Sequence, residues 1–248
     1  MRQALDLLYS ERPIDPGHLG TLRWHGILAH VEPRLPPSLR HAYRQDALFT
    51  ELRRRDLLDV ARTLTSAALP FVPLKGLVLS QLLYGDPTRR GSVDIDLAIP
   101  PELRRRTIDV LGSAGHHHQR RQYTEGTVEA FHCLRHGTLL ELHFTISTAE
   151  RFGGLFGELF GETEKISLDG EELRVPRTEV LLAYLLVHFA RHLASQRALW
   201  VEDLRRLLEL KRDTMPWDAF LALAATHRLA NALYVAITIV DDIFAEYR

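Results

Sequence analysis

Apolar residues recur at intervals of three and four along two stretches of the chain, residues 3–68 and the part that follows Arg177. This spacing places apolar side chains on one face of a helix, so both stretches are expected to be helical. Pro36-Pro37-Ser38 marks the start of a long helix over Leu39–Ala68. Further helices are expected over Glu179–Ala194, Leu199–Lys211, Pro216–Thr226 and Ala230–Tyr247.

Between these stretches the apolar runs are shorter and are bounded by glycine and proline, which is typical of strands and short helices. Strands are expected over 70–76, 93–99 and 139–146, helices over 77–84 and 102–113, and hairpin-like strand pairs over 116–134 and 166–175. This order predicts an α+β fold with a small mixed β-sheet. The expected regions are an N-terminal helical region (1–68), an α/β core (69–176) and a C-terminal helical region (177–248).

The composition is that of an ordinary globular protein, with 46% hydrophobic and 25% charged residues. A formal net charge of −1 argues against a protein that coats nucleic acid nonspecifically. The single cysteine, Cys133, excludes a disulfide framework within the chain. The N-terminus lacks a signal-peptide pattern, and no apolar run approaches the roughly 20 residues that span a bilayer. We therefore expect a soluble cytoplasmic protein with no membrane partner.

Arginine runs interrupt this near-neutral sequence. Arg53-Arg54-Arg55 is expected on a solvated face of the long helix. Arg104-Arg105-Arg106 and Arg120-Arg121 are also expected on solvated faces, with contact to RNA or another polyanion as the alternative.

The chemistry of the chain centres on Asp94 and Asp96, which lie two positions apart in an apolar run. Residues two apart on a strand point to the same face, so the two carboxylates are expected to project together. Two like charges held this close are unfavourable unless a cation neutralises them, and a divalent cation does so naturally. The pair therefore indicates a metal site, with a solvated edge strand as the alternative.

Groups that bind phosphate surround this pair in the sequence. Lys75-Gly76 ends a strand and begins a helix, where backbone amides and the helix N-terminus favour an anion. Arg90 and Ser92 precede the carboxylates. A third carboxylate on a neighbouring strand would complete a two-metal site, and Glu141 is the best candidate. A metal site beside phosphate-binding groups indicates nucleotide chemistry.

In these segments the chain resembles the DNA polymerase β-like nucleotidyltransferase superfamily, and within it a family of uncharacterised bacterial nucleotidyltransferases. The resemblance covers roughly residues 70–210. It rests on Leu74-Lys75-Gly76, Tyr84, Asp86-Pro87, Arg90, Asp94-Ile95-Asp96-Leu97, Glu141-Leu142-His143-Phe144, His188, His192 and Asp203. The Arg90–Asp96 segment is also similar to nucleotidyltransferase-type toxins of toxin–antitoxin pairs.

The resemblance implies an enzyme that transfers a nucleoside monophosphate from an NTP, with ATP expected, to an acceptor hydroxyl or phosphate, releasing pyrophosphate. Mg²⁺, or alternatively Mn²⁺, is the implied cofactor, held by Asp94, Asp96 and Glu141 as the catalytic residues. Lys75, Gly76, Arg90 and Ser92 are the implied nucleotide-binding residues. The implied core is a nucleotidyltransferase unit, with the C-terminal helices as a wall of the substrate cleft.

The sequence departs from the superfamily pattern at two positions, and alternatives to an active enzyme of this kind stay open. Leu77 follows Gly76 where serine or glycine is common, and the third carboxylate is Glu141 rather than aspartate. A nucleotide-binding or regulatory module without catalysis is therefore one alternative. A toxin-like enzyme acting on tRNA and a helical interaction protein are the others.

Several histidines have both a functional and a structural interpretation. His143 shares a strand face with Glu141 and either supports the site or is a buried structural residue. His188 and His192 lie one helical turn apart, where packing or a pocket wall is expected more than metal binding. Together with Asp203, these residues are possible substrate-cleft residues.

The sequence leaves other properties open. The acceptor is a small molecule, a peptide product or an RNA end, and the oligomeric state is undefined. The helical pattern still runs at Arg248, so a further helix or subdomain is expected in longer relatives.

Overall fold

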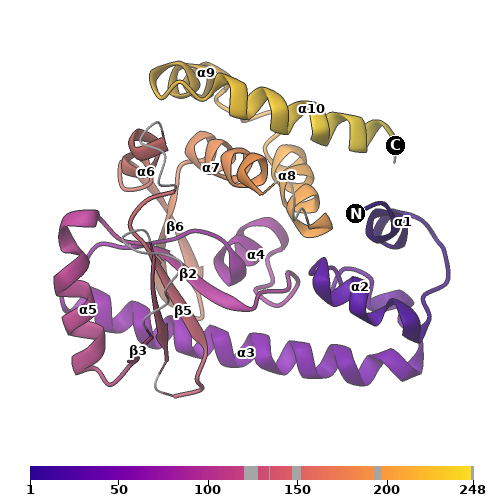
Figure 1. The fold of residues 1–248 in the computed structure, drawn as a ribbon, viewed down its shortest axis with the longest axis horizontal. Helices are drawn as coiled ribbons and strands as arrows, with labels where there is room; N and C mark the ends of the chain where they lie inside the picture. The colour runs from indigo at the N-terminus through magenta and orange to yellow at the C-terminus, as the bar shows by residue number, and fades with distance from the viewer. Residues whose placement is uncertain (120–127, 134, 147–151, 193–196, 247–248) are drawn as a thin grey trace. The chain divides into compact units, whose positions relative to one another are not determined.

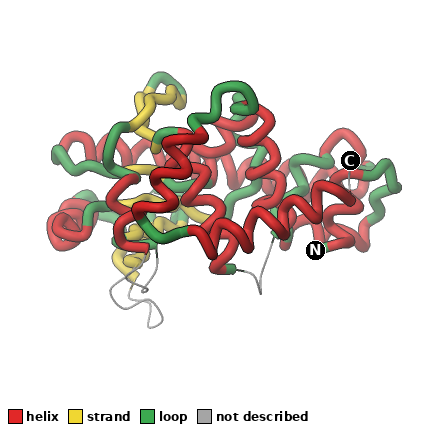
Figure 2. Tube along the Cα trace, turned by 90° about the horizontal axis from the view of Figure 1, so that it is seen from above, coloured by secondary structure: helices red, strands yellow, loops and turns green. Residues whose placement is uncertain are grey.

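The computed structural model describes residues 1–119, 128–133, 135–146, 152–192 and 197–246. The chain divides into two compact units. The first, here called the helical unit, comprises Met1–Ala47, Arg89–Gly91 and Thr178–Arg248. The second, the sheet unit, comprises Leu48–Thr88 and Ser92–Arg177. All described strands belong to the sheet unit, and helices make up most of the remaining chain (Figure 2).

The sheet unit contains a mixed five-stranded sheet in the order β1-β2-β5-β4-β3. Strand β2 is parallel to β5, whereas the other neighbouring pairs are antiparallel. A separate hairpin of β6 and β7 turns at Asp169-Gly170, as expected from the sequence. The strands are β1 (Val72–Pro73), β2 (Asp94–Ala98), β3 (His117–Gln119), β4 (Val128–His132), β5 (Leu139–His143), β6 (Thr163–Leu168) and β7 (Glu171–Pro176).

The long helix α3 (Pro37–Ser66) runs across the strands of the sheet (Figure 1). The hydrophobic core of this unit lies against one face of the sheet. Ile95 and Leu97 of β2 and Leu140 and Leu142 of β5 pack there with apolar residues of α3. The period of two leaves the alternating positions of both strands on the opposite face. The helices of the unit are the C-terminal part of α3 (Pro37–Ser66), α4 (Gly76–Tyr84), η3 (Pro101–Leu103), α5 (Arg104–Ser113) and α6 (Gly153–Glu158).

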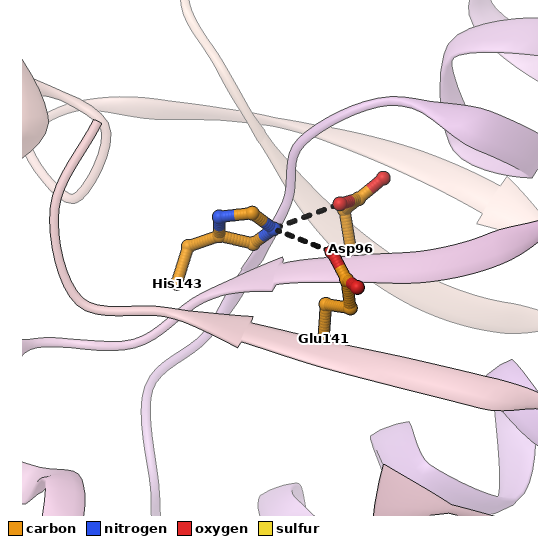
Figure 3. Close-up of side chains that lie close together, drawn as sticks. All are labelled: Asp96, Glu141 and His143. Carbon is orange, nitrogen blue, oxygen red and sulfur yellow. Dashed lines mark hydrogen bonds and ion pairs between the residues drawn. The ribbon is translucent and has the colours of Figure 1, made fainter. Parts of the chain in front are cut away.

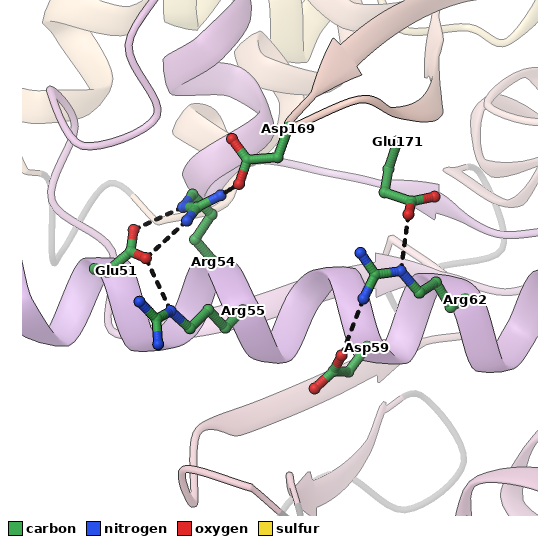
Figure 4. A network of polar contacts seen from close by, with 7 residues as sticks. All are labelled: Glu51, Arg54, Arg55, Asp59, Arg62, Asp169 and Glu171. Atoms are coloured by element: carbon green, nitrogen blue, oxygen red, sulfur yellow. Dashed lines mark hydrogen bonds and ion pairs between the residues drawn. The ribbon is translucent and has the colours of Figure 1, made fainter.

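Polar contacts along α3 join this helix to the β6–β7 hairpin (Figure 4). The Arg54 guanidinium donates to both Glu51 carboxylate oxygens at 2.7 Å and also pairs with Asp169. Arg62 Nε lies 2.8 Å from Glu171 Oε1. The expectation of a solvated arginine face is therefore wrong for Arg54, whose side chain is 16% exposed, because the hairpin supplies a carboxylate partner.

The helical unit is organised around α7 (Thr178–Arg191), whose residues from Thr178 to Val187 are all buried. Helices α8 (Ala198–Leu210), α9 (Trp217–Thr226) and α10 (Ala230–Glu246) all pack against it. The N-terminal elements of this unit are α1 (Arg2–Tyr9), η1 (Pro16–His18), α2 (Leu19–Trp24) and η2 (Glu32–Arg34). No helix within the described ranges is long and apolar enough to cross a membrane.

The expected α+β class is confirmed, and the helices and strands lie near the expected positions. The first expected strand is short, because only Val72–Pro73 pairs with β2. Helix α6 was not expected, because its glycines are poor helix formers. Arg120, Arg121 and the rest of 120–127, within the hairpin-like pair expected over 116–134, lie outside the described residues.

Candidate active site

Two parallel strands bring the predicted carboxylates together. In the β2–β5 pair, Asp96 is opposite Glu141, Asp94 is opposite Leu139, and Ala98 is opposite His143. Asp94, Asp96, Glu141 and His143 therefore share the sheet face that is opposite the leucine-rich core. The alternation of acids with Ile95 and Leu97 produces this arrangement, since burying the apolar set fixes the register.

Asp96, Glu141 and His143 form the tightest cluster on this face (Figure 3). His143 Nε2 lies 2.8 Å from Asp96 Oδ1 and 4.0 Å from Glu141 Oε2. One ligand atom from each of the three residues lies within 4.8 Å of the others. Asp94 shares the face but is not part of this cluster, so the closest group differs from the expected Asp94, Asp96 and Glu141 set by one residue.

Lys75 places a positive charge next to this cluster. Its Nζ lies 3.0 Å from Asp96 Oδ2, and the Asp96 side chain is only 2% exposed. Burial alone would raise the pKa of the Asp96 carboxyl, but the Lys75 ammonium and the His143 hydrogen bond outweigh burial and hold that pKa well below its usual range. Asp96 is therefore an ionised carboxylate at neutral pH, with a cation on one oxygen and an imidazole on the other.

Gly76 begins α4 directly after Lys75, as the strand–glycine–helix order predicts. Its φ of +65° is a conformation that side chains rarely adopt. A Cβ at this position would lie 3.1 Å from the Ser92 hydroxyl oxygen and 3.8 Å from the Asp94 carbonyl oxygen. Only glycine fits this close approach of the helix start to Ser92 and Asp94 without crowding.

A small pocket opens at this turn. It is lined by Leu57, Pro73, Lys75, Gly76, Leu77, Asp94, Ile95 and Asp96. Its polar lining combines a lysine, two aspartates and the backbone of a helix start, which are the groups expected for a nucleotide and a cation. The Ser92 hydroxyl, placed beside Gly76, donates to the Asp94 carbonyl oxygen at 2.6 Å.

The donor set suits a divalent metal ion. Carboxylate oxygens of Asp96 and Glu141 are ligands that Mg²⁺ and Mn²⁺ both accept, and Asp94 offers a further oxygen on the same face. The imidazole nitrogen of His143 is a ligand that transition metals accept more readily than Mg²⁺. Among the residues that the structure describes, Asp96, Glu141 and His143 form the single three-residue group with this potential.

Arg90 and Asp203 form a buried ion pair within the helical unit. Arg90 Nε lies 2.9 Å from both Asp203 carboxylate oxygens, and Nη2 lies 2.9 Å from Oδ2. The two side chains are 5% and 2% exposed. The Arg90 guanidinium is thus committed to Asp203, a residue that the sequence suggested for the substrate cleft. A contact between Arg90 and nucleotide, and the cleft role of Asp203, stay predictions.

His188 and His192 lie one turn apart on α7, and their ring centroids are 4.7 Å apart. The Trp200 ring packs at 4.7 Å from His188 and 5.6 Å from His192. Both histidines are therefore part of an aromatic cluster in the helical unit, which agrees with the packing interpretation. Their role in a substrate cleft stays a prediction.

The pairing of Lys75 with Asp96 is the functional relationship that the sequence did not predict. Strand β1 is antiparallel to β2, and the Leu74 amide donates to the Asp96 carbonyl at 3.1 Å. This register places the residue after Leu74 beside the Asp96 side chain. Recognising it from the sequence would have required the pairing of two short strands, for which the alternation pattern gives no register.

A solved structure shares this fold. The antibiotic-resistance factor ANT(2″)-Ia matches 73% of this chain and 94% of its own, with 14% identity and a TM-score of 0.52. The lincosamide antibiotic adenylyltransferase LnuA matches 62% of this chain and 94% of its own, with 15% identity and a TM-score of 0.44. A nucleotidyltransferase-like protein from Paracoccidioides brasiliensis matches 77% of this chain and 93% of its own, with 18% identity and a TM-score of 0.43.

The sequence itself also matches a known family. No curated protein sequence matches the chain. The model of a family described as uncharacterised nucleotidyltransferases matches residues 14–245, which is most of the chain. The fold, the paired carboxylates and this match agree, and the chain belongs to the uncharacterised nucleotidyltransferase family.

Proposed function

We propose that this nucleotidyltransferase uses ATP and a divalent cation, with Mg²⁺ as the first candidate, to transfer AMP to a small-molecule acceptor with release of pyrophosphate. Membership of the nucleotidyltransferase family supports nucleoside monophosphate transfer. The nucleotide, the metal and the acceptor are the parts that we add.

One observation carries the proposal. Asp96 and Glu141 are opposite each other on parallel strands, and the same Asp96 lines a pocket with Lys75 and the helix start at Gly76. Asp96 therefore belongs both to the carboxylate pair and to the pocket at the start of α4, whose backbone can bind an anion. Nucleotidyl transfer needs this juxtaposition, because a cation has to contact both the protein and the triphosphate.

Asp94, Asp96 and Glu141 are the residues that would hold Mg²⁺ in this proposal. The ion, when bound, offsets the charge of the triphosphate and lowers the pKa of the acceptor hydroxyl. Asp96 is ionised at neutral pH because Lys75 and His143 stabilise its charge. Its carboxylate oxygens are therefore already charged and can serve as ligands for a cation.

Lys75 and Gly76 would bind the triphosphate. The backbone at the start of α4 presents amide groups to an anion, and the helix dipole favours negative charge there. The Lys75 ammonium, next to this turn, is a point charge that would exchange its contact with Asp96 for a phosphate oxygen. Ser92 would contribute by turning its hydroxyl from the Asp94 carbonyl to a phosphate.

The reaction that these groups would support is an in-line displacement. The acceptor oxygen forms a bond to the α-phosphorus, and the bond from that phosphorus to the bridging oxygen of the β-phosphate breaks. Pyrophosphate leaves with the electron pair, and the acceptor hydroxyl loses its proton. The chain's part is to hold the triphosphate at Gly76 and to keep the Asp96 carboxylate ionised beside it.

The contacts of Arg104 and Arg106 on α5 favour a small-molecule acceptor over RNA. Arg104 pairs with Glu129 and stacks on Phe144, with its guanidinium carbon 5.4 Å from the ring centroid. Arg106 donates to the Ala67 carbonyl at 2.9 Å. These side chains make contacts within the sheet unit, so they do not form an array dedicated to phosphates. A toxin-like enzyme acting on tRNA remains the second candidate, supported by the Arg90–Asp96 motif alone.

A binding experiment that needs no acceptor tests the nucleotide site. Calorimetric titration with α,β-methylene-ATP should show binding that depends on Mg²⁺ and weakens at least about tenfold in Asp96→Asn. Asp109→Asn is the matched control, because Asp109 is exposed on α5. Binding that is indifferent to Mg²⁺ and unchanged by Asp96→Asn would contradict the proposal. Binding that persists without any turnover would instead support a regulatory module.

A further inference from the structure

His143 lies on the opposite side of the Asp96–Glu141 pair from Asp94. On the face that carries the carboxylates, β2 presents in order Asp94, Asp96 and Ala98. On the same face β5 presents Leu139, Glu141 and His143, with Glu141 opposite Asp96. The two strands are parallel, so Asp94 stands before the pair and His143 stands after it. The pocket at Gly76 includes Asp94 and Asp96. The Asp94 side therefore lines the pocket proposed for the nucleotide, and His143 is not among the residues that line it.

The donor atoms on the His143 side differ in kind from those on the Asp94 side. Asp94 and Asp96 offer oxygen alone, which suits Mg²⁺. Asp96, Glu141 and His143 offer two carboxylates and an imidazole nitrogen, a mixture that divalent transition metals prefer. The face thus carries two chemically distinct donor sets that share Asp96.

The distances in this second set suit one ion. Two ligands that each lie about 2.1 Å from a metal are about 3 Å apart at right angles and about 4.2 Å apart when opposite. His143 Nε2 lies 2.8 Å from Asp96 Oδ1 and 4.0 Å from Glu141 Oε2, and both values fall near this range (Figure 3). Ligation requires Nε2 without a hydrogen, so a neutral His143 would carry its single proton on Nδ1 when a metal ion takes the place of the hydrogen bond to Asp96.

We propose that His143 is a metal ligand and that the centre formed by Asp96, Glu141 and His143 binds a divalent transition-metal ion in preference to Mg²⁺. The inference rests on the proposed function and extends it to two unlike ions, so that Glu141 holds the transition-metal ion while Asp94 and Asp96 hold Mg²⁺. The nucleotide enters with Mg²⁺ on the Asp94 side. The ion on the His143 side is held by the protein before the nucleotide arrives.

Mn²⁺ is a suitable probe, because its paramagnetism reports bound nitrogen. The full chain, stripped with a chelator and free of nucleotide, should bind Mn²⁺ with electron spin-echo modulation from a directly bound ¹⁴N. Excess Mg²⁺ should displace this Mn²⁺ poorly. His143→Ala should remove the modulation and weaken the binding of Mn²⁺ at least about tenfold. The control is His117→Ala, because His117 is exposed on β3 at the far edge of the sheet.

A second variant separates ligation from positioning. His143→Gln retains a nitrogen that donates to Asp96 but has no imidazole. If His143 only positions Asp96, this variant keeps wild-type Mn²⁺ affinity, and the inference is wrong. If His143 is a ligand, the variant binds Mn²⁺ weakly and shows no ¹⁴N modulation.

The remaining outcomes separate this inference from the proposed function. Mn²⁺ that binds through Asp96 without ¹⁴N modulation, or that Mg²⁺ displaces easily, overturns the inference. Turnover of ATP with Mg²⁺ alone in the same sample would then leave the proposed function standing. Failure to bind Mn²⁺, together with failure to bind the Mg²⁺ complex of α,β-methylene-ATP, would overturn both.

Discussion

Lys75 and Asp96 form an ion pair with 3.0 Å between Nζ and Oδ2. The Lys75 side chain is 20% exposed and that of Asp96 is 2% exposed, and both residues line the pocket. Without metal, the ammonium neutralises the carboxylate that the cation would bind. Lys75 and the cation therefore stabilise the same charge, and each should be able to substitute for the other.

Lys75→Met should destabilise the metal-free chain by about 2 kcal/mol, which is less than the 3–5 expected for a fully buried pair, because Lys75 is partly exposed. Mg²⁺ should restore much of this loss by taking the place of the ammonium. Urea unfolding with and without Mg²⁺ measures both effects. Lys165→Met, which removes a pair with both side chains 59% exposed, should change stability by less than about 1 kcal/mol. A Lys75→Met chain as stable as wild type without Mg²⁺ would refute the pairing.

Gly76→Ala should weaken nucleotide binding as well as stability. Both Gly76 and Gly85 have positive φ, but only at Gly76 would a Cβ meet another group, the Ser92 hydroxyl oxygen at 3.1 Å. Gly85→Ala is therefore the matched control, with similar backbone strain of about 1 kcal/mol and no crowding. Thermal unfolding and α,β-methylene-ATP titration of both variants provide the comparison. Equal effects on nucleotide binding would show that the approach at Gly76 has no role.

Arg90→Met should be strongly destabilising, because it leaves the Asp203 carboxylate buried without its guanidinium. The free energy of unfolding should fall by about 3–5 kcal/mol. The double variant Arg90→Met/Asp203→Leu should recover most of this loss, since neither charge of the pair is left. A double-mutant cycle by urea unfolding measures this coupling. A stable Arg90→Met chain that has lost only nucleotide affinity would favour the nucleotide role predicted from the sequence.

Stability should fall as the pH drops from about 6.5 to 4. Burial, with the positive N-terminus and Arg197, lowers the pKa of His25 to about 4. The neutral Nδ1 of His25 accepts the Ala198 amide at 3.2 Å. The unfolded chain takes up a proton at higher pH than the folded chain, so acid favours unfolding in this window.

The matched substitution for His25 is asparagine, whose amide oxygen also accepts from Ala198 but does not titrate. Urea unfolding at pH 7 and pH 5 should show that His25→Asn loses less free energy of unfolding between these two pH values than wild type does. His41→Asn, at an exposed position on α3, should lose as much as wild type. If His25→Asn retained the full pH dependence, another group would have to account for it.

The sequence predicts those parts of the fold and site that depend on local periodicity. Alternation along β2 and β5 places Asp94, Asp96, Glu141 and His143 on one face, because burial of the leucines fixes that face. The strand–glycine–helix order likewise predicts the turn at Gly76.

Relationships between distant segments could not be predicted in this way. Arg90 and Asp203 are far apart in the sequence, and nothing near either residue signals the other. The pairing of Arg54 with Asp169 depends on how the β6–β7 hairpin packs against α3, which the helical pattern does not encode. Side-chain partners of this kind follow from tertiary packing rather than from local pattern.

The most direct test of the account is transfer of label from [α-³²P]ATP. Wild type, Asp96→Asn and Asp109→Asn would be incubated with Mg²⁺, Mn²⁺ and a bacterial extract of metabolites and RNA as the acceptor pool. The account predicts a labelled product with wild type and Asp109→Asn, and a loss of at least about a hundredfold with Asp96→Asn. Equal labelling by all three proteins, or by none, would contradict it.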